Sequence, residues 1–395
     1  MMLKTIILVL LSAQIYANVW NSTRKWNESD IIGFKSWVST SLERDIFSSK
    51  DSPYYGIKTD CADAIFAYMA IYSLENDLYF QLKLDHNNFI DNNSKRFDKY
   101  PESERLKKLI HHIGSSAGTY SLAYFNSYPI SIDDISAGDI YVTEWRKNGA
   151  LNRHAYMIKK FLPTGHFELY SSTTPVKVRK LALRKGMPLH LFESSPWGFK
   201  RLAPHYLINK DLIDISRNQY AAKKSWGKNF MSKLSKRIAT EKDSINLNLK
   251  RRLSNICDML TGRESEVREA VQYKEEISRC MNSKEYYEYS TPSRDNSIQS
   301  AMTGLLVGWK KIRKSSLDQV DTNITSALEY FLGKSKDQDA REDLFNICPL
   351  VIEVSSFTMR DFFMLKRSSK ISSNPNDPYR MRWGLNGNKS SCPKY

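Results

Sequence analysis

A cysteine at the start of a predicted helix is the residue of this chain best suited to covalent chemistry. Cys61 follows a polar turn that ends in Thr59 and Asp60, and small or apolar residues recur at helical spacing from Ala62 to Leu74. Thr and Asp are helix-capping residues, so we expect Cys61 in the first helical turn. The helix dipole there favours a thiolate, the form of cysteine that attacks a carbonyl carbon. Because most free cysteines are small buried apolar residues instead, Cys61 predicts catalysis only together with a base.

A histidine that opens a predicted strand could supply this base. Alternating residues predict strands near 140–142, 154–158 and 166–170, which would pair as a small antiparallel sheet. In the second strand, alternation puts His154 on the same face as Tyr156. His154 could then face the Cys61 helix, take the proton from the thiol and return it to a leaving amine.

The remaining elements are expected to be one more strand and a series of helices. Residues 176–183 predict a strand on which Lys177, Arg179 and Lys180 would form a basic edge of the sheet. A helix is expected over 31–46, and an exposed insertion rich in Asn and Asp over 83–100, followed by a helix that begins near Pro101. Beyond about Leu212 the pattern is mostly helical, within 223–252, 264–281, 297–314 and 320–331.

The first 17 residues have the pattern of a secretory signal peptide. Lys4 precedes the apolar run Thr5 to Leu11, and small residues follow up to Ala17, where we expect cleavage. That run is too short to span a bilayer, and no later segment approaches about 20 apolar residues. We therefore expect a soluble mature chain that is exported to the periplasm or the extracellular space, without stable membrane insertion.

Export changes the meaning of the five cysteines. In an oxidising compartment Cys257, Cys280, Cys348 and Cys392 can form two disulfides, which leaves Cys61 as an odd thiol. Four cysteines allow three pairings, and the sequence does not choose among them. The pairing of near neighbours, Cys257 with Cys280 and Cys348 with Cys392, is the local choice.

The formal net charge of +16 favours anionic partners. For an exported protein, peptidoglycan or another anionic polymer of the cell envelope is a better expectation than nucleic acid. The charge is concentrated in residues 223–252, where ten Lys or Arg stand against two acids and apolar residues recur near helical spacing. A solvated basic helix face explains the same pattern without any ligand.

Three short motifs resemble the NlpC-type branch of papain-like cysteine peptidases, a family that includes cell-wall hydrolases. They are Thr59-Asp60-Cys61-Ala62-Asp63, Ala137-Gly138-Asp139-Ile140 and Arg153-His154-Ala155-Tyr156-Met157-Ile158, in an order that matches the family's helix, turn and strand. The resemblance covers about residues 53–175. It implies that Cys61 is the nucleophile and His154 the general base.

The chain departs from the family pattern at two places that matter for catalysis. Ala62-Asp63 stand where the family has Ser-Gly after its cysteine. The family's third polar residue would fall at Leu169, which cannot orient an imidazole ring. Among its polar neighbours Glu168, Ser171 and His166, we favour Glu168, since a carboxylate would stabilise an imidazolium.

These observations predict an α+β protein in three parts. Residues 1–17 are the signal peptide, 18–212 a papain-like domain of N-terminal helices packed on a small antiparallel sheet, and 213–395 a basic, mainly helical C-terminal region. The expected function is that of an exported cysteine hydrolase that cleaves an amide bond, in peptidoglycan stem peptides, through Cys61, His154 and Glu168. The alternative is a catalytically inactive papain-like scaffold whose basic helices bind an anionic cell-wall polymer or a partner. No cofactor is expected, and no His/Cys cluster has the spacing of a metal site.

Overall fold

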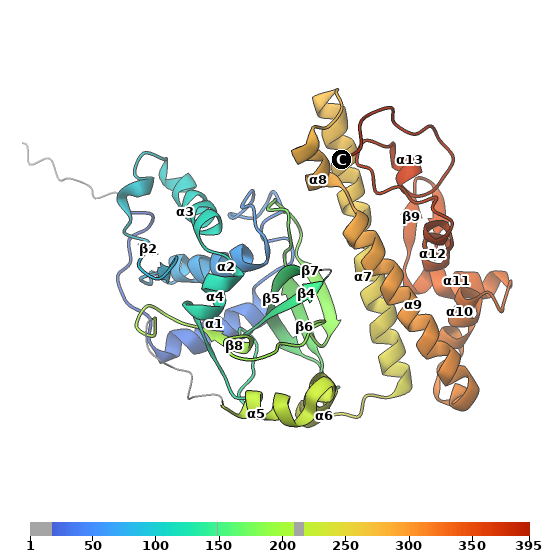
Figure 1. Ribbon diagram of the computed structural model, residues 1–395, viewed down its shortest axis with the longest axis horizontal. Helices are drawn as coiled ribbons and strands as arrows, with labels where there is room; N and C mark the ends of the chain where they lie inside the picture. Colours follow the sequence, from blue (N-terminus) through green and yellow to red (C-terminus); the bar gives the residue numbers. More distant parts are fainter. Residues whose placement is uncertain (1–17, 148, 209–216) are drawn as a thin grey trace, which may run out of the picture.

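The computed structural model describes residues 18–147, 149–208 and 217–395 (Figure 1), so the predicted signal peptide lies outside the described residues. The chain is α+β, as predicted, and builds two separate hydrophobic cores. The first core contains residues from Val19 to Leu234, and the second contains residues from Leu249 to Trp383. We call the parts around these cores the first and the second lobe.

The centre of the first lobe is a six-stranded antiparallel sheet with the strand order β3-β8-β4-β5-β6-β7. Its strands are β3 (Ser127–Pro129), β4 (Ile140–Lys147), β5 (Ala150–Phe161), β6 (Phe167–Ser171), β7 (Ala182–Gly186) and β8 (Gly198–Leu202). The three strands predicted from alternation correspond to β4, β5 and β6, which form consecutive antiparallel pairs. The short strands β3 and β8 were not predicted.

The strand predicted over residues 176–183 has other bounds in the structure. Strand β7 begins only at Ala182, and Lys177 instead forms an isolated bridge with Thr59. Lys177 and Arg179 are buried, with ion pairs to Glu269 and Glu266 of the second lobe. The predicted basic edge is therefore wrong, because two of its three cations are neutralised between the lobes.

Four helices of the first lobe are α1 (Glu28–Thr40), α2 (Cys61–Glu75), α3 (Glu102–Ser116) and α4 (Thr119–Tyr124). Helix α2 is central, since every residue from Cys61 to Ser73 is buried. The segment 83–100 is less exposed than predicted. It contributes to the hairpin of β1 (Gln81–Lys83) and β2 (Phe89–Asp91) and to the short helix η1 (Lys95–Phe97), and it buries Asn92, whose side chain accepts from Phe80 N–H and donates to Trp20 C=O.

Helices α5 (Arg217–Trp226) and α6 (Phe230–Ile238), joined by η3 (Gly227–Asn229), also belong to the first lobe. Phe230 and Leu234 lie in the first core, and the Phe230 ring packs 5.3 Å from the ring of Phe192. The predicted boundary at 212/213, within the undescribed segment 209–216, assigned these helices to the C-terminal region. Their apolar side chains pack in the first core instead.

The second lobe is mainly helical, as predicted. Its elements are α7 (Ile245–Ile277), α8 (Ser283–Tyr289), α9 (Pro292–Ser315), η4 (Leu317–Gln319), α10 (Thr322–Leu332), α11 (Gln338–Ile347), β9 (Leu350–Ile352), β10 (Ser355–Phe357), α12 (Met359–Arg367) and α13 (Tyr379–Arg382). Helix α7 is one long helix that includes most of the segment predicted separately over 264–281. No helix in the described part of the chain is long and apolar enough to cross a bilayer.

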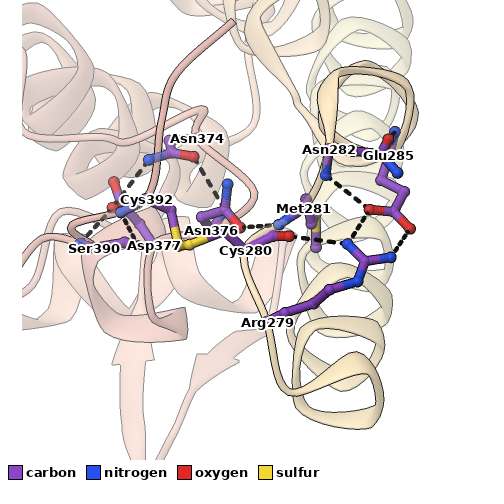
Figure 2. The surroundings of a disulfide bond; sticks show 10 residues. All are labelled: Arg279, Cys280, Met281, Asn282, Glu285, Asn374, Asn376, Asp377, Ser390 and Cys392. Carbon is purple, nitrogen blue, oxygen red and sulfur yellow. Dashed lines mark hydrogen bonds and ion pairs between the residues drawn. A yellow bond between two sulfur atoms is a disulfide. The ribbon is translucent and has the colours of Figure 1, made fainter.

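Two disulfides hold the second lobe together, but not in the local pairing. Cys257 of α7 pairs with Cys348, and Cys280 pairs with Cys392. The local pairing fails because the path of the chain brings the end of α11 and the C-terminal tail back to α7. Figure 2 shows how the tail is held: next to the Cys280–Cys392 bridge, Asp377 accepts from Ser390 N–H at 2.9 Å.

The two lobes meet through polar groups. Helix α7 runs beside the sheet edge formed by β7 (Figure 1). Arg44 of the first lobe lies 3.4 Å from Asp258 of α7, and the Lys177 ammonium lies 3.1 Å from Glu269. A hollow of about 750 Å³ separates the lobes beside these pairs. Because this interface is charged and partly open, the two apolar cores stay separate.

Candidate functional site

Cys61 is the first residue of α2, as the sequence predicted. The Asp60 side chain accepts from the backbone N–H groups of Ala62 and Asp63, which fixes the start of the helix. The thiol is buried, with 6% of the residue exposed, and it forms no disulfide. Its sulfur lies 3.5 Å from the Thr119 hydroxyl, at the start of α4.

The electrostatic setting of Cys61 opposes a thiolate. Burial, together with the neighbouring Asp60 carboxylate, raises the pKa of the thiol to about 11. Hydrogen bonds from the Thr119 hydroxyl and from the backbone N–H of Ala155 act in the other direction but do not outweigh burial. The expected effect of the helix dipole is thus overcome by desolvation and by the carboxylate that caps the same helix.

The side chain of His154 lies on the face of β5 that points away from α4. Arg153 and Ala155 share the opposite face, and the Arg153 guanidinium lies 5.5 Å from the centre of the Tyr120 ring of α4. The Cys61 sulfur lies close to this part of β5, since it contacts the Thr119 hydroxyl of α4 and the backbone N–H of Ala155, and its charge also raises the pKa of Tyr156. Alternation in β5 therefore puts the His154 ring on the face opposite Arg153.

The surroundings of His154 agree with this orientation. Its ring packs edge-on against Tyr156 at 4.5 Å, and Tyr156 pairs across the sheet with Tyr141. The Tyr141 ring contacts Phe192, which packs on α6 rather than on α2. Burial, together with the neighbouring His190, lowers the pKa of His154 to about 4. The structure therefore contains no hydrogen bond between the described side chains of Cys61 and His154, which a thiolate–imidazolium pair requires.

Glu168 is not beside His154 either. Its carboxylate lies 3.5 Å from the Lys160 ammonium, on the neighbouring position of β5. Leu169, which pairs with Ile158, occupies the His154 face, so Glu168 points to the other face of the sheet. His166, a second candidate for the third residue, bonds to Thr164 instead. The structure does not bring the three predicted catalytic side chains together.

Asp63, which replaces the family's glycine, has a structural role. Its carboxylate accepts from Asp60 N–H at 3.0 Å and so completes a capping box at the start of α2. A Cβ atom at Gly114 of α3 would lie 2.8 Å from this carboxylate, so only glycine lets the two helices approach. Burial and the charge of Asp60 raise the pKa of Asp63 to about 7.

The Gly138-Asp139 motif also serves the fold. Asp139 is fully buried, accepts from Ser136 N–H and forms an ion pair with Arg201 at 2.7 Å. Gly138 has a φ of 82°, and a Cβ there would lie 2.9 Å from the backbone of Lys35. Neither residue reaches the Cys61 thiol through a hydrogen bond given by the structure.

The basic stretch 223–252 divides into two parts with different roles. Two of its later cations are engaged: Lys250 pairs with Asp321 at 2.7 Å and Arg251 with Asp243 at 2.8 Å. The earlier lysines have no ion pair among the described residues, and no acid occurs between residues 217 and 240. These lysines, which we call the α5–α6 surface, are Lys223, Lys224, Lys228, Lys233 and Lys236.

Metal chemistry finds no support in the described residues, where no group of three or more His, Cys, Asp or Glu side chains could hold an ion. Sequence reasoning missed Thr119 as the neighbour of Cys61, because nothing in the local pattern links α4 to the start of α2. Among the described side chains no hydrogen bond joins Cys61 and His154, and the likeness to NlpC-type peptidases rests on short motifs alone. No family model, no curated protein and no solved structure matches this chain.

Proposed function

We propose that this protein is an exported binding protein that holds an anionic polymer of the cell envelope, such as peptidoglycan, on its α5–α6 surface. The observation that carries the proposal is the set of five lysines on this surface without an ion pair among the described residues. The first lobe would be a papain-like scaffold in which α2 and the sheet form the core without catalysing hydrolysis. A Cys61 thiol with a raised pKa, and the lack of a hydrogen bond between Cys61 and His154 among the described side chains, support this choice.

The arrangement of the lysines suits a long anion better than a single charge. Lys224 and Lys228 are about one helical turn apart, as are Lys233 and Lys236, and all four are exposed. The Lys233 ammonium also lies 6.0 Å from the centre of the half-buried Trp226 ring. A solvated helix face normally mixes both signs of charge, whereas this one carries only cations. A positive field of this kind attracts polyanions and falls off with salt.

Binding to purified cell wall tests the proposal. In a sedimentation assay with insoluble peptidoglycan, the variant Lys228→Gln/Lys233→Gln/Lys236→Gln should bind about tenfold more weakly than the unchanged protein. The matched control Lys284→Gln/Lys370→Gln/Lys394→Gln removes the same charge from exposed lysines of the second lobe and should bind normally. An equal loss of binding in both variants would show that net charge alone explains the binding. Normal binding of both variants would reject the α5–α6 surface as the binding site.

The second candidate is a cysteine hydrolase that cleaves an amide bond in peptidoglycan stem peptides through Cys61 and His154. One observation favours it: Cys61 opens α2 beside β5, the strand that carries His154. Release of soluble peptide from purified cell wall by the unchanged protein, abolished in Cys61→Ala, would support the hydrolase. The binding proposal expects no release from either protein.

A further inference from the structure

A second group of lysines follows one face of α9 in the second lobe. Val307, Lys310, Lys311 and Lys314 are spaced i, i+3, i+4 and i+7, so they form one stripe along the helix. All four are exposed, and Val307 is 52% exposed. The three lysines have no ion pair among the described residues. Like charges at this spacing repel one another, so the helix gains no stability from them.

The stripe forms one wall of a hollow of about 560 Å³. Leu332 and Lys334, at the end of α10, line the hollow together with the stripe. Arg313 also lines it, but its guanidinium pairs with Glu329 at 2.8 Å. Among the described residues no acidic side chain lines this hollow, which we call the α9–α10 groove.

Glu329, the partner of Arg313, does not neutralise the lysines of the groove. Glu329 accepts from Trp309 Nε1 at 2.9 Å and from Arg313 at 3.0 Å, so its charge is already matched. Helices α9 and α10 both end here, at Ser315 and Leu332, and their C-terminal carbonyls attract cations.

The helix ends neutralise part of the positive charge of these lysines but not all of it. Each helix end carries about half a negative charge, so two ends supply about one. The four lysines without an ion pair, Lys310, Lys311, Lys314 and Lys334, supply four positive charges. The groove therefore stays strongly positive after the helix dipoles are counted.

We propose that the α9–α10 groove is a binding site for a ligand that carries several phosphate groups. Phosphate suits the groove, because several lysine ammonium groups, each a point charge that binds phosphate, can match the closely spaced charges of a ligand with several phosphates. The volume of about 560 Å³ lies in the range of small-molecule sites. Val307 and Leu332 supply an apolar contact for the part of the ligand that bears the phosphates.

This site is separate from the α5–α6 surface and does not rest on the proposed function. Figure 1 shows α5, α6 and the C-terminal end of α9 toward the same end of the molecule, but on different lobes. The two sites can therefore be changed one at a time, and each proposal can fail while the other stands.

Calorimetric titration with inorganic tripolyphosphate, at about 0.15 M salt, tests the site on the full chain. The variant Lys310→Gln/Lys314→Gln should bind about tenfold more weakly than the unchanged protein. The control Lys284→Gln/Lys370→Gln removes the same charge elsewhere on the second lobe and should bind normally. The α5–α6 variant Lys228→Gln/Lys233→Gln/Lys236→Gln should also bind tripolyphosphate normally.

A second arm identifies the source of the phosphate. Vesicles that contain phosphatidylglycerol, compared with pure phosphatidylcholine vesicles, report binding to a lipid headgroup. The groove is supported as the phosphate site if either probe binds the unchanged protein and the control, and this binding is lost in Lys310→Gln/Lys314→Gln. Absence of binding to both probes, equal loss in the control, or loss only in the α5–α6 variant overturns it.

Discussion

Asn255 of α7 and Lys185 of β7 are joined by both polar groups of the Asn255 side chain. The amide oxygen accepts from Lys185 N–H at 2.7 Å, and the amide nitrogen donates to the Lys185 carbonyl. Strand β7 is the last strand of the sheet, and an exposed edge leaves such backbone groups unpaired. One asparagine therefore satisfies part of the open edge and fixes α7, and with it the second lobe, against the first.

Replacing Asn255 should destabilise the contact between the two lobes. The variant Asn255→Ala leaves the N–H and C=O of Lys185 without their partners, so we expect a loss of about 1–3 kcal/mol in the free energy of unfolding. Urea unfolding followed by circular dichroism measures it. Asn229→Ala, at an exposed position on α6's N-terminal side, is the control and should change stability by less than about 0.5 kcal/mol. An unchanged Asn255→Ala protein would mean that the charged pairs alone hold the lobes.

Lys200 should make stability rise with pH in the alkaline range. It is 1% exposed, donates to the Ala123 carbonyl, and has a pKa lowered by burial to about 7. Between about pH 7 and pH 10 the unfolded chain keeps the proton that the folded chain has lost, so the free energy of unfolding increases, by at most about 1.4 kcal/mol per pH unit. Lys200→Met should lack this increase.

Urea unfolding at pH 7 and pH 9.5 compares the two proteins, and Lys370→Met serves as the exposed control. The free energy of unfolding of Lys200→Met, minus that of the unchanged protein, should fall as the pH rises. A difference that is the same at both pH values would show that Lys200 is not the titrating group.

Asp63 should have the opposite effect on the pH dependence of stability. Its pKa is raised to about 7, so between about pH 4 and pH 7 the folded chain holds a proton that the unfolded chain has lost, and stability falls as the pH rises. Asp63→Asn keeps an acceptor for Asp60 N–H but carries no charge. We expect its stability relative to the unchanged protein to increase by about 2 kcal/mol between pH 5 and pH 8. Parallel pH profiles of the two proteins would contradict this assignment.

The Cys61 thiol should react slowly in the folded protein. With its pKa raised to about 11, the thiolate fraction at pH 8 is about one in a thousand, compared with about one in four for a free cysteine. Alkylation by iodoacetamide, read by mass spectrometry, should thus be about a hundredfold slower in the folded state than in urea. Rapid alkylation below pH 7 would indicate an activated thiol and would favour the cysteine hydrolase over the binding protein.

Local patterns were enough to predict the elements around the candidate site. Alternation located β4, β5 and β6, and the Thr59-Asp60 turn located the start of α2 at Cys61. The odd number of cysteines also predicted that one stays unpaired, and this one is Cys61. These features depend on residues close together in the chain, so a short stretch of sequence carries them.

Tertiary packing decided which of those residues meet. Alternation shows that His154 and Tyr156 share a face, but only the packing of α4 shows that the Cys61 thiol contacts the Thr119 hydroxyl. Likewise, the spacing of cysteines does not reveal that Cys348 returns to Cys257. The periods of strands and helices define faces, whereas the partner of each face depends on the path of the whole chain.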